Sequence, residues 1–415
     1  MALTYQQTKL VKDTIPVLRE HGERISTIFY RTMLTEHPEL NDYFNGVNLK
    51  NGRQPRALTA IILNFAANIN NISELIPKFE RMCNKHCSLG IKPEHYEVVG
   101  KYLLQAFGEV LGDRMTTDVL AAWTKAYWVL AKMLIGREAQ LYKDFEAWAS
   151  WRPFKIDRVV QETDDVYSFY LVPKDGRRLP KFQPGQYVSV QIQVPGGHLQ
   201  SRQYSLSDAS RDDHYRISVK RDEGSQYANT VSKSYQNPGI VSNILINYLT
   251  VGSVLNVSHP AGEFFLDTNN DSNVPLVLIS AGIGITPMIS ITNTVLATQP
   301  GRQVSFIHGS RKTIPFEEHI AQLRRKNPNF HSKIFKSHPS AGDRPGASYD
   351  YDCRIDLTKL AETDMYLHNG AAEYYLCGPE GFMVDASHFL FSRGVSKNRV
   401  KLELFTTGEL AAKQG

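Results

Sequence analysis

The sequence predicts three domains of different fold class: an all-α domain over residues 1–150, an antiparallel β-barrel over 151–268 and an α/β domain with a parallel sheet over 269–415. Three patterns in the spacing of apolar residues predict this order. The first segment shows the three- and four-residue spacing of amphipathic helices, the second alternates apolar and polar residues, and the third contains continuous apolar runs. The length agrees, because 415 residues at roughly 150 per domain allow two to three domains.

Composition and charge are those of an ordinary folded protein. Hydrophobic residues make up 42% of the chain and charged residues 21%, which excludes a disordered or fibrous protein. A formal net charge of +5 without a Lys/Arg cluster argues against a nucleic-acid-binding surface. Four cysteines are too few for a disulfide framework, and the most apolar stretches, 120–135 and 274–289, are interrupted by lysines or by glycines and polar residues. We expect a cytoplasmic, monomeric protein with neither a transmembrane segment nor a nucleic-acid partner.

The first predicted domain shows only helical periodicity. Two amphipathic stripes repeat within 99–110 and 123–135. Prolines recur roughly every twenty residues, which indicates short helices joined by tight corners. His21 and His37 each stand directly before a glycine or proline, so we expect both histidines at such corners.

The second predicted domain shows strand periodicity. In 187–194, five apolar residues alternate with Ser189, Gln191 and Gln193, and 215–220 repeats the alternation. Turn signals such as Asp-Gly at 175–176 separate such runs. This pattern predicts an antiparallel sheet that forms a small barrel.

The third predicted domain begins with the continuous run VPLVLIS at 274–280, which is followed by a glycine-rich turn and a helical pattern. Residues 304–307 and 374–377 are further candidates for buried strands, with helical stretches between them. Buried strands that alternate with helices are typical of an α/β domain with a parallel sheet.

Two short motifs of the third domain predict a phosphate-binding site. Glycines let the backbone approach a pyrophosphate, and the amides of the helix that follows favour an anion. The third glycine of the dinucleotide fingerprint is absent, and a Gly-X-Gly pair alone is more often a simple turn. A Cys-Gly-Pro motif ends another buried strand, so both motifs would lie at the carboxyl edge of the sheet, where ligands of such sheets bind. The candidate nucleotide residues are Gly282, Ile283, Gly284, Ile285, Thr286, Pro287, Cys377, Gly378 and Pro379.

These paired motifs resemble the ferredoxin–NADP reductase family, in which a flavin-binding barrel precedes a nicotinamide domain. The flavin motif that this resemblance requires is present at 202–205, although an exposed arginine at a strand end would give the same pattern. Guanidinium suits a phosphate, an aromatic face suits the flavin ring, and a hydroxyl suits a ring nitrogen. Residues 225–238 form a longer connection than the family usually has. The resemblance implies an FAD site formed by Tyr187, Arg202, Gln203, Tyr204, Ser205, Gly239, Val241, Ser242 and Phe405, where a buried strand residue is the alternative for Phe405.

One histidine of the first domain stands out. Only His86 falls within a helical run, although a lone helical histidine is more often a core residue than a metal ligand. A zinc site with Cys83 and Cys87 lacks a fourth ligand at suitable spacing. Glu138 lies in an apolar stripe and Tyr96 begins another, which predicts two buried polar partners. We therefore predict a relay in which Glu138 accepts a hydrogen bond from His86, directly or through Tyr96.

The helical segment resembles a globin. Phe44 matches the aromatic side chain that wedges the haem, and Tyr30, Gln54 and Leu58 match distal positions. Pro55 departs from the usual pattern and places Gln54 near the helix cap. The resemblance implies a haem pocket in this segment.

The whole chain resembles the flavohaemoglobin family more closely than globins in general. The match includes 85–86, 91–96 and 137–139, and the family has the same order of globin, flavin barrel and nicotinamide domain. Lys85 and Glu403 match positions between haem and flavin where charge would tune redox potentials. The implied catalytic residues are Tyr30, Gln54, Tyr96 and Glu138, the redox-tuning residues are Tyr30, Lys85 and Glu403, the haem-pocket residues are Phe44, Leu58 and His86, and His86 is the proximal iron ligand.

The family resemblance implies a nitric oxide dioxygenase with haem b, FAD and NAD(P)H. NAD(P)H reduces FAD, FAD reduces haem, and the dioxygen-bound haem converts nitric oxide to nitrate. The residues alone indicate only flavin-linked reduction of a haem that binds a diatomic ligand. A haem-linked alkylhydroperoxide reductase or diaphorase, or an oxygen-binding sensor or carrier, stays open as an alternative. The choice between NADH and NADPH also stays open, because 310–312 (Ser-Arg-Lys) suits either a 2′-phosphate or an exposed turn.

Overall fold

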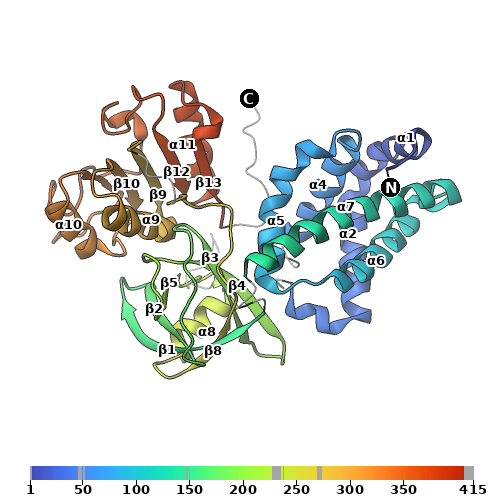
Figure 1. The fold of residues 1–415 in the computed structure, drawn as a ribbon, viewed down its shortest axis with the longest axis horizontal. Coiled ribbons are helices and arrows are strands. Elements are labelled where there is room, and N and C mark those ends of the chain that lie inside the picture. Colours follow the sequence, from blue (N-terminus) through green and yellow to red (C-terminus); the bar gives the residue numbers. More distant parts are fainter. Residues whose placement is uncertain are drawn as a thin grey trace. The chain divides into compact units, whose positions relative to one another are not determined.

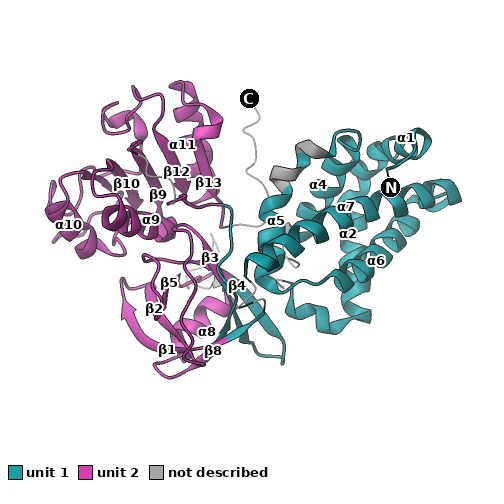
Figure 2. Ribbon diagram, viewed as in Figure 1, with its two compact units in different colours: residues 1–152, 189–202, 256–263 teal, residues 153–188, 203–255, 264–415 magenta. Residues whose placement is uncertain are grey.

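The computed structural model describes residues 2–44, 49, 52–145, 148, 150–226, 235–236, 238–268 and 273–405. The chain divides into two compact units (Figure 2). Unit 1 comprises 1–152, 189–202 and 256–263, and unit 2 comprises 153–188, 203–255 and 264–415. These units do not follow the three predicted domain boundaries, which stay predictions.

Helices form most of unit 1, as predicted (Figure 1). Their apolar faces meet in a single cluster of buried side chains that draws on every long helix. The helices are α1 (Tyr5–Asp13), α2 (Ile15–Glu36), η1 (Pro38–Asp42), α4 (Arg53–Ala67), η2 (Ile72–Leu75), α5 (Ile76–Leu89), α6 (Pro93–Leu111), η3 (Gly112–Arg114) and α7 (Thr117–Asp144).

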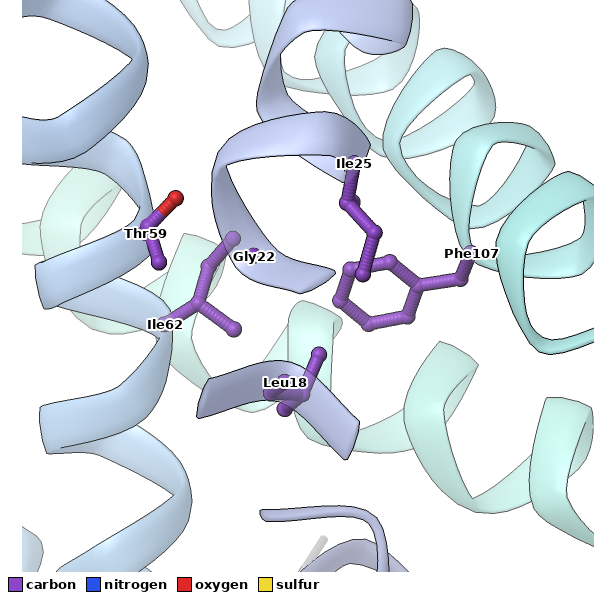
Figure 3. Close-up of a pocket in the computed structure, with 6 residues that line it drawn as sticks. All are labelled: Leu18, Gly22, Ile25, Thr59, Ile62 and Phe107. Carbon is purple, nitrogen blue, oxygen red and sulfur yellow. The ribbon is translucent and has the colours of Figure 1, made fainter. Parts of the chain in front are cut away.

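Two expectations about these helices are wrong. The helices are not all short, because α2 has 22 residues and α7 has 28. Most of the prolines lie in the first turns of helices and do not mark frequent corners. His21 lies inside α2 and not at a corner, because the glycine after it serves helix packing. A Cβ atom on Gly22 would lie 2.3 Å from Cγ2 of Thr59 on α4. Figure 3 shows Gly22 at this crossing, beside a cavity between α2, α4 and α6 that is too small for a water molecule.

The antiparallel sheet has the strand order β4-β3-β8-β1-β2-β5. An isolated bridge joins Leu206, the residue after β4, to Ile217 of β5, but the described strands β4 and β5 do not pair, so the sheet is not a closed barrel. Its strands are β1 (Arg152–Gln161), β2 (Val166–Pro173), β3 (Tyr187–Gln193), β4 (Leu199–Ser205), β5 (Tyr215–Lys220) and β8 (Val254–Val257). Helix α8 (Ile240–Tyr248) precedes β8, and the pair β6 (Ser225–Gln226) and β7 (Tyr235–Gln236) lies within the long connection, where 227–234 and 237 lie outside the described residues.

Strand β3 differs from the half-exposed strand that its alternation predicts. Both of its faces are buried through Ile192, including the polar positions. The Ser189 hydroxyl donates to the Ser88 hydroxyl of α5 at 2.9 Å, and its main-chain amide donates to Ser258. Polar side chains on this strand therefore find partners inside unit 1 instead of facing water.

The parallel sheet of unit 2 has the order β11-β10-β9-β12-β13, and neighbouring strands pair in parallel, as predicted. Alternate residues of its strands belong to two apolar clusters, one shared with α9 and α10 and the other with α11. The strands are β9 (Leu276–Ala281), β10 (Val304–Ser310), β11 (Phe330–Lys336), β12 (Glu373–Cys377) and β13 (Val400–Glu403), and the helices are η4 (Gly282–Gly284), α9 (Ile285–Thr298), α10 (Glu317–Lys326), η5 (Leu357–Lys359), α11 (Glu380–Ser392) and η6 (Lys397–Arg399). Within the described part of the chain, no helix combines the length and apolar character needed to cross a bilayer.

Candidate functional site

The predicted relay around His86 forms in unit 1. His86 lies in the last turn of α5, and its Nδ1 atom lies 2.8 Å from Oε1 of Glu138 on α7 and 3.0 Å from the Tyr96 hydroxyl on α6. The Tyr96 hydroxyl donates to the same carboxylate oxygen at 2.6 Å. Glu138 is only 3% exposed, so the carboxylate depends on these two donors. Three helices thus place the three side chains that the sequence singled out.

The donors and acceptors of this relay have one consistent arrangement. Burial raises the pKa of Tyr96, as does the charge of Glu138, so Tyr96 keeps its proton and donates it. Nδ1 of His86 must then carry the other proton toward Glu138, which leaves Nε2 as the unprotonated ring nitrogen. No side chain in the described ranges hydrogen-bonds to Nε2. An imidazole held in this way fits an iron ligand, because the partner at the far nitrogen fixes its tautomer and orientation.

The predicted distal residues come together on α2 and α4. The Gln54 amide donates to the Tyr30 hydroxyl at 3.3 Å, and the Tyr30 and Phe44 rings meet edge to face with centroids 5.4 Å apart. Leu58 packs against the same apolar cluster one turn further along α4. Gln54 is the second residue of α4, near its cap as expected, and this position still reaches Tyr30.

Tyr30 is a hydrogen-bond donor with an unused proton. Burial raises the pKa of Tyr30 to about 12, against a smaller opposing effect of the Gln54 hydrogen bond. The hydroxyl already accepts from Gln54, and no described residue accepts its proton. Such a donor fits a bound diatomic ligand that carries partial negative charge.

Helix α5 is also held by polar contacts to the strand segments of unit 1. The Asn84 side-chain oxygen accepts from the Gly262 amide at 3.0 Å, and Ser88 accepts from Ser189. Between these residues, burial lowers the pKa of Lys85 to about 8, with repulsion from Arg81 and Arg202. Sequence reasoning selected Lys85 and Arg202 but missed Asn84 and Ser88. Polar residues near a helix end are common, so their positions gave no reason to choose them.

Arg202 begins the predicted flavin motif. Its guanidinium donates to the side chain of Gln200 and to the Ser201 carbonyl, so its head group is held beside its own strand. In unit 2, Tyr187 and Ser205 are buried, while Gln203 and Tyr204 are half-buried.

The predicted flavin-phosphate segment forms the start of α8. Gly239 is the N-cap residue, and among the described residues no side-chain cap is present at the first turn. A Cβ atom on Gly239 would lie 2.7 Å from Asp222, whose amide donates to the Ser242 hydroxyl at 3.3 Å. Val241 is buried beneath this turn. Uncapped amides at a helix N-terminus fit a phosphate group, and Asp222 is a neighbour that sequence reasoning missed.

The redox-tuning candidate Glu403 and the flavin candidate Phe405 lie at the end of the parallel sheet. Glu403 is the last residue of β13 and is buried. Phe405 lies beyond this strand and is 46% exposed, so it is not the buried strand residue that was the alternative reading.

The two nucleotide motifs meet in unit 2. β9 and β12 are neighbours, with Ser280 opposite Cys377, and each strand leads directly into its motif. A Cβ atom on Gly284 would lie 2.3 Å from the Cys377 carbonyl oxygen, so only glycine allows this approach. Gly282 has φ +56 and open space around it.

The first turn of α9, which includes Ile285, Thr286 and Pro287, has no side-chain cap, and the Thr286 hydroxyl donates to the Ile283 carbonyl at 3.0 Å. The Gly378 nitrogen would lie 2.8 Å from a Cβ atom on Gly284, the residue before this turn, and Pro379 is the N-cap residue of α11. The carboxyl edge of the sheet fits a dinucleotide pyrophosphate.

The zinc alternative finds no support in the geometry. Among the described residues, no group of three His, Cys, Asp or Glu side chains could hold a metal ion. All four cysteines are free thiols, and burial raises the pKa values of Cys83 and Cys87, which keeps both thiols protonated.

Family comparisons identify three domains in the predicted order. The globin family model matches residues 27–134, the oxidoreductase FAD-binding domain matches 153–266, and the oxidoreductase NAD-binding domain matches 278–388. The sequence is 42% identical to the flavohemoprotein of Bordetella parapertussis, with 97% of this chain and 98% of the relative covered. It is 40% identical to the flavohemoprotein of Bacillus subtilis, with 96% of each chain covered.

Solved structures agree with this order. The crystal structure of flavohemoglobin from Malassezia yamatoensis with bound FAD and heme has a TM-score of 0.82 and 30% identity, and the match covers 98% of this chain and all of that one. The FAD/NAD-binding domain of nitric oxide dioxygenase from Vibrio cholerae has a TM-score of 0.52 and 33% identity over 61% of this chain and 97% of that one. With full-length relatives above 30% identity and a globin joined to FAD-binding and NAD-binding oxidoreductase domains, the chain belongs to the flavohemoprotein family.

Proposed function

We propose that this flavohemoprotein is a nitric oxide dioxygenase that binds haem b and FAD, takes electrons from NAD(P)H and converts nitric oxide and dioxygen to nitrate. One observation carries the proposal. His86 has Nδ1 engaged by buried Glu138 and Nε2 free of described partners, while Tyr30 offers a proton that no described residue accepts. The similar reductase domain of Vibrio cholerae, from a protein named nitric oxide dioxygenase, supports the same reading.

The residues of unit 1 have distinct tasks in this proposal. When bound, haem supplies an iron that binds diatomic ligands, and FAD divides a two-electron transfer from nicotinamide into single electrons. His86 would hold the iron through Nε2, and Glu138 and Tyr96 would keep its proton on Nδ1 and increase its electron donation. Tyr30, oriented by Gln54, would donate a hydrogen bond on the distal side, where Phe44 and Leu58 exclude water.

The residues of unit 2 would bind the two other cofactors. The uncapped first turns of α8 and α9 would each receive phosphate oxygens, from FAD and from the dinucleotide respectively. Ser205 would hydrogen-bond to the flavin ring, and Gly284 beside Cys377 would let the dinucleotide lie flat on the edge of the sheet. Free thiols suit the reducing cytoplasm in which we expect the protein to act.

The test is catalytic nitrate formation. Nitric oxide and dioxygen need one further electron to become nitrate, so one NAD(P)H should serve two nitric oxide molecules. We expect purified, cofactor-loaded protein to remove nitric oxide aerobically with this stoichiometry, with nitrate as product. Parallel runs with NADH and NADPH at equal concentration would determine the preferred nucleotide.

The alternatives predict different results. A haem-linked alkylhydroperoxide reductase or a diaphorase would oxidise NAD(P)H rapidly with a hydroperoxide or dye but would form little nitrate. A sensor or carrier would bind dioxygen without continuous NAD(P)H oxidation. Either outcome would overturn the proposed function.

A further inference from the structure

A chain of polar side chains in unit 2 links the segment after the flavin motif to helix α9. The Ser290 hydroxyl of α9 donates to the Asp208 carbonyl at 2.7 Å, and the Asn293 amide of the same helix donates to Oδ1 of Asp208 at 2.8 Å. His319 of α10 lies 2.7 Å from Oδ1 of Asn293. Arg216 of β5 lies 3.8 Å from Oδ2 of Asp208. Asp208 therefore contacts both the antiparallel sheet and the helix that follows the dinucleotide motif.

The donors and acceptors of this network allow one assignment. Because Nδ2 of Asn293 donates to Asp208, its Oδ1 must accept, and Nε2 of His319 must carry the donated proton. Burial lowers the pKa of His319, as does the nearby Arg216, so the ring is neutral with its proton on Nε2. Asp208 accepts at one oxygen from Asn293 and offers the other to Arg216, and no donor in this path faces another donor.

The charged side chains of the network are largely buried, which restricts their movement. The side chains of Asp208 and Arg216 are 17% and 10% exposed. The Arg216 guanidinium also donates to the Ser207 carbonyl and lies over the rings of Phe316 and Tyr170. A partly desolvated carboxylate with several fixed donors holds its position more rigidly than a surface ion pair.

The sequence positions of the linked residues indicate the role of the network. Asp208 stands three residues after Ser205, the last residue of the flavin motif, and Ser290 stands three residues after Pro287, the last residue of the dinucleotide motif. We propose that Asp208 is a positioning residue that holds the nicotinamide-binding helix α9 in register with the flavin motif, through Ser290 and Asn293. This inference rests on the proposed reduction of FAD by NAD(P)H, because register matters only if the two rings must meet.

The expected consequence falls on the rate and not on nucleotide affinity. Removing the carboxylate leaves both phosphate-binding turns intact but loosens their relative placement. A misplacement of about 1 Å between reacting groups can cost about a hundredfold in rate. We expect Asp208→Ala to slow anaerobic flavin reduction by NAD(P)H about tenfold to a hundredfold, while the KM for NAD(P)H changes little.

The experiment compares four test variants and one control variant of the full-length, cofactor-loaded protein by stopped-flow absorption. Asp208→Ala and Asn293→Ala should both slow flavin reduction, and the double variant should be no slower than Asp208→Ala, because both changes cut the same link. Asp208→Asn keeps an acceptor oxygen and should recover part of the rate. Asp212→Ala is the control on the same loop, because the Asp212 side chain is exposed and forms a surface ion pair with the exposed Arg178.

A second readout does not depend on turnover. The long-wavelength charge-transfer absorption of NAD⁺ stacked on dithionite-reduced flavin should weaken in Asp208→Ala at saturating NAD⁺ and stay normal in Asp212→Ala. Carbon monoxide binding after dithionite reduction should be unchanged in every variant. Wild-type rates in Asp208→Ala, or purely additive effects in the double variant, would overturn the inference. Failure of the wild-type flavin to be reduced by NAD(P)H would instead refute the proposed function. If Asp208→Ala does not fold, Asn293→Ala and Asp208→Asn carry the same test.

Discussion

The close approach of Gly284 to Cys377 predicts the effect of a single added methyl group. In Gly284→Ala, the new Cβ atom would lie 2.3 Å from the Cys377 carbonyl oxygen, 2.5 Å from its carbonyl carbon and 2.8 Å from the Gly378 nitrogen. All three atoms are backbone, so no side chain can rotate away. The substitution must therefore separate the two motifs.

The size of that separation follows from the contact. Cβ atoms almost never approach another atom closer than 3.0 Å, so the Cys377 oxygen must move by at least about 0.7 Å. Overpacking of this kind costs about 1–3 kcal/mol of stability. The movement falls where both motifs should contact the dinucleotide, and displacement on this scale lowers rates by about tenfold to a hundredfold. We expect kcat/KM for NAD(P)H to fall by that factor.

The assay separates the nucleotide site from the rest of the protein. Flavin reduction by NAD(P)H should slow in Gly284→Ala, whereas dithionite should still reduce the haem and carbon monoxide should bind at the wild-type rate. Gly301→Ala is the matched control, because it lies beyond the other end of α9 with no atom within 4 Å of an added Cβ. We expect that variant to reduce flavin normally.

Two results would refute this reasoning. If Gly284→Ala kept the wild-type kcat/KM for NAD(P)H, the two motifs could not form the nucleotide site in this geometry. If carbon monoxide binding fell together with flavin reduction, the defect would be general misfolding, and the local argument would fail.

Three further predictions concern unit 1. Tyr30→Phe should speed dioxygen dissociation about tenfold, since a charge-assisted hydrogen bond contributes about 1.5 kcal/mol. The wild-type dissociation rate should be constant from about pH 6 to 9, because burial raises the pKa of Tyr30 to about 12. Flash photolysis measures this, and an unchanged off-rate would remove Tyr30 from the distal role. Glu138→Ala should destabilise the haem-bound protein by about 2–4 kcal/mol, because the His86 and Tyr96 donors lose their acceptor, and Glu138→Gln should destabilise it less. Urea unfolding followed at the haem absorption measures both losses, and equal losses in the two variants would contradict the prediction. The pKa of Lys85 is lowered to about 8 from 10.5. Between these two pH values the folded state binds fewer protons than the unfolded state, so the free energy of unfolding should rise as the pH increases. Lys85→Met should abolish that rise, and identical pH profiles of the two proteins would count against the burial of Lys85.

Much of the site could be predicted because its polar residues interrupt apolar patterns. Glu138 occupies a position that helical periodicity reserves for the core, and a buried carboxylate requires partners. His86 and Tyr96 are the polar side chains that satisfy it, as the spacing suggested. The nucleotide motifs could also be predicted: a Gly-X-Gly pair alone is more often a simple turn, but here it lies between a buried strand and a helix.

Other contacts could not be predicted, because periodicity reports exposure but not the identity of a distant partner. Ser189 follows the alternation of a solvent-facing position, yet it is buried against Ser88, 101 residues away. Gly22 was interpreted as a turn signal because glycine breaks helices on average, but close packing on Thr59 outweighs that preference. The Asp208 network likewise joins segments whose proximity only the fold creates.

Helix ends of opposite polarity agree with the positions at which we propose that the ligands bind. His86 lies in the last turn of α5, where Gly90 at φ +75 ends the helix. The carbonyls at this end carry partial negative charge, and those of His86 and Cys87 accept from the Ile91 and Gly90 amides. That end, with Glu138 behind the ring, favours an electron-rich imidazole, which is what a ligand to a dioxygen-binding iron requires. The uncapped starts of α8 and α9 carry partial positive charge, which suits the phosphates of FAD and of the dinucleotide. If the two kinds of helix end were exchanged, cations would lie beside main-chain amides and phosphates beside main-chain carbonyls. The direction of each helix therefore restricts which of its ends can bind which cofactor.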